Sequence, residues 1–317
     1  MKKNLLFCCI AVAGLAMSSC KKEPENKFSF SVSTYNYVSF LDDSHDPVIK
    51  RGYYNYNFDA INNKVVISTD MVDLGDDNDS RFVTDPFPYN SSIVNFNGDY
   101  SPVYYGSDLN PCTDINGQPI KNLRFELTPI YYVPPTISYT PDPTSPLPQP
   151  DLSYRERPNG MSGVAPKMLY DVGDKYRVYT FWPDLYYKGV TKTSVNGVED
   201  SSFESQDVGY RLKFRISEKK VDVVMYNVQF NPNMPKMECL ILPDLDVKFT
   251  NNGFIVEDRN IVPLYVEGDH ILENPRFPFT TFKFTAETNM VEGNCEFTVA
   301  GRFSGSFVGR YMEFVVR

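Results

Sequence analysis

Residues 210–221 read YRLKFRISEKKV, with apolar side chains at every second position before a polar turn. A period of two places one set of side chains on a single face of a β-strand, and a polar turn followed by a second apolar run predicts a hairpin. The same period recurs along the chain, for example at 54–58, 123–127 and 176–182. Asn-Gly pairs, the strongest short hairpin signal, stand between such runs at 97–98, 116–117, 196–197 and 252–253. The sequence therefore predicts an all-β protein of antiparallel strands.

The composition agrees with this fold class and excludes one class of ligand. The 317-residue chain has 15% aromatic residues, with 22 Tyr, 23 Phe and one Trp, and aromatic side chains favour strands. With 42% hydrophobic and 22% charged residues, it has enough apolar side chains to form a core. Its net charge of −9 argues against nucleic acid as a partner, because phosphate binding requires clustered Lys and Arg.

The first residues predict export and a lipid anchor. Lys2 and Lys3 precede an apolar run over 5–17, which is shorter than the ~20 residues that span a bilayer and indicates a signal peptide over 1–19. The run ends in MSSC at 17–20, which resembles a bacterial lipobox, although Met stands where Leu is usual. This resemblance implies that Cys20 carries acyl chains such as palmitate and begins the mature protein. A charged tether over 20–27 follows, and the expected location is the outer membrane, facing either the periplasm or the cell surface.

A proline-rich segment divides the remaining chain. Val133 to Pro150 holds seven of the 24 prolines, and proline donates no hydrogen bond to a β-ladder. We therefore predict a first β-domain over 28–132, a linker over 133–166 and a second β-domain over 167–317.

The two predicted domains resemble each other. Phe58–Val65 aligns with Phe214–Val221, because both runs place a polar turn and a Lys between Phe and Val. At similar offsets, two further pairs of segments align: Pro102–Tyr104 with Pro263–Tyr265, and Leu123–Phe125 with Phe282–Phe284. The prediction is a tandem of two related antiparallel barrels or sandwiches, and the pattern does not distinguish between these two closures.

No motif in the chain predicts catalysis, a metal or a cofactor. Nucleophile elbows, phosphate-binding glycine loops and Cys/His metal spacings are missing from the sequence. One of the two histidines, His45, has Ser44 and Asp46 beside it, but neighbours this close in sequence rarely form a triad. We therefore expect no enzyme activity, no metal site and no cofactor.

Three cysteines follow the lipobox, an odd number that cannot all pair within one chain. Cys239 and Cys295 lie in apolar runs of the same half, whereas Cys112 lies in the other. The sequence leaves open whether Cys239 and Cys295 form a disulfide or stay as buried thiols.

Paired aromatic residues supply the candidate ligand face. Adjacent tyrosines point to opposite faces of a strand, so one ring of each pair can face water. The richest such stretch is WPDLYY at 182–187, and we predict a shallow patch of Trp182, Tyr186 and Tyr187 that binds a ligand by stacking. The alternative for Trp182 is a core position, because tryptophan is highly buried on average.

The second half also carries a family resemblance. Residues 226–237, YNVQFNPNMPKM, are similar to the Phe-x-x-x-Met-Pro-x-Met region of Bacteroidetes lipoproteins with calycin-like β-barrel domains, and the glycine-spaced run 301–309 is similar to their closing strands. The likeness covers about 205–317. It implies a barrel and an envelope location, and it implies no catalytic residue.

These observations lead to one functional hypothesis and two alternatives. The first is a non-enzymatic cell-envelope lipoprotein that binds neutral glycan or an envelope protein, because the acidic chain repels anionic polymers. The alternatives are a fimbrillin-like adhesin or structural subunit, and a calycin-type carrier of a small apolar ligand. The oligomeric state is not predicted.

Overall fold

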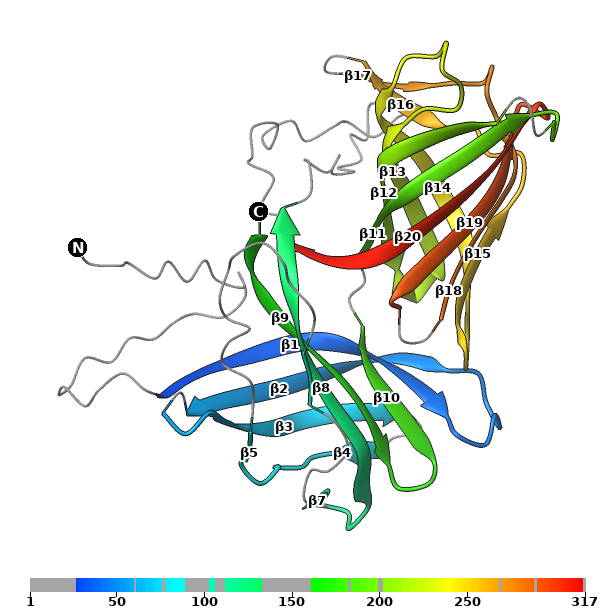
Figure 1. Ribbon diagram of the computed structural model, residues 1–317. Helices are drawn as coiled ribbons and strands as arrows, with labels where there is room; N and C mark the ends of the chain where they lie inside the picture. Colours follow the sequence, from blue (N-terminus) through cyan, green and yellow to red (C-terminus); the bar gives the residue numbers. More distant parts are fainter. Residues whose placement is uncertain are drawn as a thin grey trace, which may run out of the picture. The chain divides into compact units, whose positions relative to one another are not determined.

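The computed structural model describes residues 27–59, 61–75, 78–88, 103–105, 112–132, 161–181, 184–198, 202–267, 270–287 and 290–315. Strands make up nearly all of them, which confirms the all-β prediction (Figure 1). The chain divides into two compact units, the first formed by Met1–Tyr131 and Met161–Trp182, the second by Tyr132–Gly160 and Pro183–Arg317. The predicted signal peptide, lipobox and tether up to residue 26 lie outside the described residues.

The second unit is a closed antiparallel barrel of eight strands. They pair in the circular order β11 (Asp184–Val195), β12 (Phe203–Arg215), β13 (Lys220–Val228), β14 (Met237–Thr250), β15 (Gly253–Asp258), β18 (Phe279–Glu287), β19 (Glu292–Val299) and β20 (Phe303–Val315), and β20 pairs back with β11. A hairpin of β16 (Leu264–Glu267) and β17 (His270–Glu273) is attached to β14. The sequence left the choice between barrel and sandwich open, and this unit is a barrel.

Aromatic rings fill the barrel. The rings of Tyr210 and Phe307 stack with centroids 3.9 Å apart, and Phe254 and Phe284 stack at 6.2 Å. Gly305, one of the glycines of the sequence-predicted closing strands, leaves the space that the Phe297 ring occupies. Rings that lie against glycines keep the interior densely packed where the wall curves. The regular glycine spacing of β20 therefore serves the packing of this interior.

A second apolar cluster lies on the outer wall of the barrel. It consists of six buried residues from β11, β13, β14, β16 and β17: Tyr186, Val224, Tyr226, Ile241, Leu264 and Ile271. Nearby, the guanidinium of Arg211 is 2% exposed and forms an ion pair with Asp184, with 2.6 Å between Arg211 Nε and Asp184 Oδ1. The β16–β17 hairpin thus contributes to a small core outside the main one.

The first unit is an open sheet. Its main strands pair in the order β3 (Lys64–Gly75), β2 (Val48–Asp59), β1 (Lys27–Phe40), β10 (Tyr176–Phe181), β9 (Met161–Val172) and β8 (Pro119–Tyr132). Short strands line its two edges: β4 (Asn78–Ser80) and β5 (Phe87–Pro88) pair with β3, and β6 (Val103–Tyr105) and β7 (Cys112–Thr113) pair with β8. Figure 1 shows these strands curving as a half-barrel.

The edge beside β3 is irregular, because threonine hydroxyls accept hydrogen bonds from two backbone N–H groups. The segment 78–88 follows β3 antiparallel, yet the backbone N–H of Ile67 donates to the Thr84 hydroxyl and that of Phe82 donates to the Thr69 hydroxyl. Pro86 and Pro88 have no N–H to donate to a further ladder. This edge is therefore short and irregular.

One turn joins the two edges of the open sheet. The buried carboxylate of Asp114 accepts hydrogen bonds from the backbone N–H of Asn116 and Gln118 and from the hydroxyl of Ser80. The next residue, Ile115, donates its backbone N–H to the carbonyl of Arg81 at 2.9 Å. These contacts link the turn before β8 to the segment beside β3.

The two units share a succession of strand pairings. β1, β2 and β3 pair as β11, β12 and β13 do, and β8, β9, β10 and β1 pair as β18, β19, β20 and β11 do. Two of the three alignments drawn from sequence fall on matching strands: Phe58 pairs with Val65 as Phe214 pairs with Val221, and 123–125 lie in β8 as 282–284 lie in β18.

The third alignment does not hold. Val103 and Tyr104 lie in β6, which pairs with β8, whereas Leu264 and Tyr265 lie in β16, which pairs with β14 and β17. A Pro followed by alternating apolar residues marks the start of any strand, so the match reflected local pattern alone.

The division of the chain also differs from the sequence-based boundaries. Residues 167–182, expected in the second domain, belong to the first unit, because β9 pairs with β8 and β10 pairs with β1. The proline-rich segment therefore interrupts the first unit between β8 and β9, and the division between units falls at 182–183.

Candidate functional site

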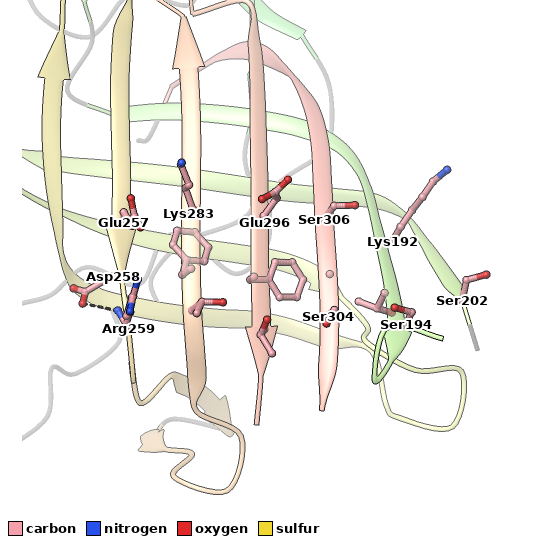
Figure 2. Close-up of a pocket in the computed structure, with 17 residues that line it drawn as sticks. Lys192, Ser194, Ser202, Glu257, Asp258, Arg259, Lys283, Glu296, Ser304 and Ser306 are labelled. Carbon is pink, nitrogen blue, oxygen red and sulfur yellow. Dashed lines mark hydrogen bonds between the residues drawn. The ribbon is translucent and has the colours of Figure 1, made fainter. Parts of the chain in front are cut away.

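A wide polar groove of about 680 Å³ lies on the outer wall of the closed barrel. It crosses β15, β18, β19, β20 and β11, and Figure 2 shows its side chains standing on the strands. The outward positions of β20 carry Ser304 and Ser306, and β19 contributes Thr298. Small side chains at the centre and long ones at the sides account for the hollow.

Charged residues form one row across the strands. Strand register pairs Glu257 with Lys283, Lys283 with Glu296, Glu296 with Ser306, and Ser306 with Lys192. Figure 2 shows these five side chains at one level of the wall. We call this set the charged row. Its charges alternate in sign, with the neutral Ser306 between Glu296 and Lys192.

Hydroxyl groups form a parallel row one step further along the strands. Thr281 pairs with Thr298, Thr298 with Ser304, and Ser304 with Ser194. All four side chains line the groove, and we call them the hydroxyl row. The outward direction of both rows follows from the pleat, because residues two apart on a strand share a face.

The groove contains cations and carboxylates in equal number. Lys192, Lys283 and Arg259 line it together with three acids, Glu257, Asp258 and Glu296. Among the described residues, no ion pair within 4.0 Å joins Lys283 to Glu257 or Glu296, whereas Lys192 lies 3.2 Å from Glu204. The groove is therefore neutral as a whole, and it offers charged donors and acceptors that face solvent.

This arrangement is suited to binding by hydrogen bonds. Carboxylates accept, ammonium groups donate and hydroxyls do both, so a polar ligand finds both kinds of partner along each row. Within the part of the chain that the structure describes, no group of three or more His, Cys, Asp or Glu side chains is placed to hold a metal ion. Nor does any helix there have the length and apolarity to cross a bilayer.

The aromatic patch predicted from the sequence is not formed by its two tyrosines. Tyr186 is 8% exposed and packs in the outer apolar cluster, whereas Tyr187 is fully buried against Phe284 inside the barrel. The alternation correctly placed the two rings on opposite faces of β11, but both faces are covered. Trp182 lies outside the described residues.

The Ser44–His45 pair lies on an exposed loop beside Asp42. Ser44 Oγ lies 2.8 Å from His45 Nδ1, and the Asp42 carboxylate accepts hydrogen bonds from Ser44, which lower the pKa of Asp42. All three residues are exposed, whereas a catalytic triad keeps its acid buried.

The structure decides the question of the cysteines. Cys239 borders the outer apolar cluster, whereas Cys295 is buried on the inward face of β19 opposite Phe284 and Phe307. The two thiols lie on opposite sides of the wall, and all three described cysteines are free. Burial raises the pKa of Cys239 to about 12 and that of Cys295 well above its ordinary value, so both thiols are held protonated.

Sequence reasoning did not find the groove. Its Ser, Thr, Lys and Glu residues occupy the solvent side of ordinary alternating strands, and only the register between five strands brings them together. A signal was present in TVAGRFSGS at 298–306, whose small polar residues alternate with inward-facing ones.

No family model and no curated protein sequence matches this chain. Several solved structures are similar, among them the following three. A provisionally assigned outer membrane protein of Bacteroides fragilis is 14% identical, with a TM-score of 0.29, covering 89% of this chain and 97% of its own. Transferrin binding protein B of Neisseria meningitidis is 8% identical, with a TM-score of 0.25, covering 91% and 77%. That of Haemophilus parasuis is also 8% identical, with a TM-score of 0.23, covering 90% and 76%. Likeness at these scores carries no argument about what this chain binds.

Proposed function

We propose that this protein is a non-enzymatic lipoprotein of the outer membrane, anchored through Cys20, that binds neutral glycan in the groove of its closed barrel. The observation that carries the proposal is the pair of rows, in which alternating charges and hydroxyls stand side by side on an exposed wall. The lipobox and the apolar run before it support the location.

The chemistry of the groove favours a neutral ligand rich in hydroxyl groups. An anion would meet the carboxylates of Glu257 and Glu296, and a cation would meet the ammonium groups of Lys192 and Lys283. A sugar hydroxyl both donates and accepts, so it can bond to either sign. The net charge of −9 further disfavours an anionic polymer.

The barrel interior argues against a carrier of small apolar ligands. An eight-stranded closed barrel supports the resemblance to calycin-like lipoproteins, in which such ligands bind inside. Here stacked rings such as Tyr210 and Phe307 occupy that interior. The fimbrillin-like alternative gains no support from the barrel either, because each of its eight strands is already paired on both sides.

The test uses a double variant with a matched control. Lys283→Ala with Glu296→Ala removes one charge of each sign from the charged row, and we expect at least about hundredfold weaker binding of a neutral polysaccharide, since each hydrogen bond to a charged group contributes ~1.5–3 kcal/mol. The control, Lys248→Ala with Glu238→Ala, removes the same charges from exposed positions of β14 and leaves binding unchanged. Affinity electrophoresis against neutral and acidic polysaccharides measures both.

Two outcomes would contradict the glycan assignment. One is the absence of retardation by every neutral polysaccharide, and the other is an equal loss in both double variants. The anchor has its own test: Cys20→Ala should release the protein from membranes and stop the uptake of labelled palmitate, because buried acyl chains hold a lipoprotein at ~0.8 kcal/mol per CH₂.

A further inference from the structure

We infer that the ligand is a linear glycan that lies across the strands, along the channel between the charged row and the hydroxyl row. This inference rests on the proposed function and adds the shape and direction of the ligand to it. The evidence is the register of β15, β18, β19, β20 and β11, which places both rows perpendicular to the strands.

Strand geometry sets the dimensions of the channel. Neighbouring strands are ~4.8 Å apart, so the charged row extends about 19 Å from Glu257 on β15 to Lys192 on β11. The two rows are separated by two residues along each strand, as between Glu296 and Thr298, which corresponds to about 7 Å. The band is therefore long and narrow. An extended chain one sugar wide can contact both rows over their whole length, whereas a compact ligand contacts only part of them.

Along β20 and β11 the outer surface changes from polar to apolar, which favours a ligand that crosses these strands. The next outward positions on β20 and β11 are Val308, which is 59% exposed, and Val190. On the other side, the hairpin turns near Gly197 and Gly301 end the strands. A ligand that ran along β20 or β11 would leave the polar band after two residues, and only β18 and β19 continue it, with Thr285 and Asn294. A ligand across the strands stays within the band over five strands.

The channel is also open at both ends. The charged row stands on five neighbouring strands, and Figure 2 shows Lys192 and Glu257 at its opposite ends. Internal segments of a long polymer can therefore bind as well as chain ends. Binding of this kind depends on the length of the oligosaccharide and not on a reducing or non-reducing terminus.

The experiment combines oligosaccharide length with the position of a substitution. Isothermal titration of the full-length mature protein with one neutral linear series, from the disaccharide upward, should show affinity rising with each sugar and then reaching a plateau once the band is filled. Reduction of the terminal sugar to its alditol should leave the affinity of the longer members unchanged.

Two single variants at exposed positions make the test directional. Glu296→Ala, at the centre of the charged row, should weaken every member of the series about tenfold. Glu257→Ala, at its β15 end, should leave short members unchanged and lower the affinity of only those long enough to reach β15, so that its plateau comes one step earlier. The Lys248→Ala, Glu238→Ala protein serves as the control.

The inference fails if a neutral glycan binds with the same affinity at every length, or if Glu257→Ala and Glu296→Ala weaken all lengths equally. The proposed function survives both of these outcomes. If no member of any neutral series binds and only an envelope protein is retained, the proposed function itself fails. Loss of short and long ligands alike through misfolding is recognised from the thermal midpoint of each variant.

Discussion

The second unit closes into a barrel and the first stays open, although both contain the same succession of six paired strands. The difference lies in the connection from β13 to β18 in the second unit and in the equivalent connection from β3 to β8 in the first. In the second unit β14 and β15 join β13 to β18, whereas in the first unit the short β4–β7 stand between β3 and β8. The comparison shows that a shared set of strand pairings does not determine closure. Closure requires two continuous strands in one connection.

The interiors of the two units differ in the same sense. Rings packed against glycines fill the closed barrel, whereas the open sheet buries a polar network in which the Tyr54 hydroxyl donates to Asn36 Oδ1 at 2.8 Å and lies 3.0 Å from the Tyr170 hydroxyl. Packing of aromatic rings stabilises the closed unit, whereas side-chain hydrogen bonds contribute to the stability of the open unit. Four predictions test this contrast.

The largest effect is expected where the barrel closes. A Cβ at Gly189 would lie 2.5 Å from the Cα of Gly309 on β20, so Gly189→Val should destabilise the second unit by more than about 4 kcal/mol. Gly197→Ala is the control, because open space surrounds that position and its positive φ costs only ~1–2 kcal/mol. Hydrogen exchange should show loss of protection in β11–β20 and normal protection in β1–β10. Equal loss in both units would contradict their independence.

The next effect concerns the ion pair on the outer wall. Arg211→Ala leaves the partly buried Asp184 carboxylate without its two hydrogen bonds to the guanidinium and should cost about 3 kcal/mol in urea unfolding. Lys121→Ala in the first unit breaks an exposed pair with Asp174 and should cost less than ~1 kcal/mol.

A double variant separates this burial effect from a loss of packing. Replacing the pair by Arg211→Met with Asp184→Leu should recover most of the stability, because no buried charge remains. A double variant as unstable as Arg211→Ala would show that packing alone is lost.

An alkaline titration tests the same outer cluster. Burial raises the pKa of Tyr186 from 10.0 to about 12, so the folded protein favours the neutral phenol more than the unfolded chain does. This contribution, about 2–3 kcal/mol, is complete below pH 10 and is lost as the pH rises from 10 toward 12. Tyr186→Phe should flatten the fall in the free energy of unfolding over that range. An unchanged slope would mean that Tyr186 does not report on the cluster.

The smallest effect compares two buried hydroxyls. Tyr54→Phe removes a hydroxyl with two close partners in the open unit and should cost about 1–3 kcal/mol. Tyr210→Phe removes one whose contact with the Thr191 hydroxyl is 3.5 Å long, and should cost a few tenths of a kcal/mol. Similar costs in thermal unfolding would show that the hydroxyl network of the open unit contributes no more than one long hydroxyl contact in the closed unit.

Local patterns predicted several strands and two hairpins, but not the pairing of strands that are distant in the sequence. The alternation at 210–221 predicted the β12–β13 hairpin, and the match of 58–65 to 214–221 predicted two equivalent hairpins. The boundary between the units was misplaced because β9 and β10 follow the proline-rich segment yet pair with β8 and β1. The β1–β10 pairing joins residues more than 100 positions apart, as Tyr35 with Phe181, and nothing in either segment alone indicates it.

At the candidate site, too, local patterns predicted the faces of a strand but not what covers them. Alternation correctly placed Tyr186 and Tyr187 on opposite faces of β11, but it did not show that the β16–β17 hairpin contributes to a cluster over the outer face. A ring exposed on one strand becomes buried when another segment covers it, and that segment can come from anywhere in the chain.

The order of residues accounts for the all-β class, the apolar run that ends in MSSC and the equivalence of two hairpins, because each depends on neighbours within about ten positions. The closure of one unit, the separation of Cys239 from Cys295 and the groove were decided by tertiary structure. Each of these depends on which strands lie side by side and in which register. In the groove, a shift of one residue in β19 or β20 would turn Glu296 or Ser304 inward and remove both rows.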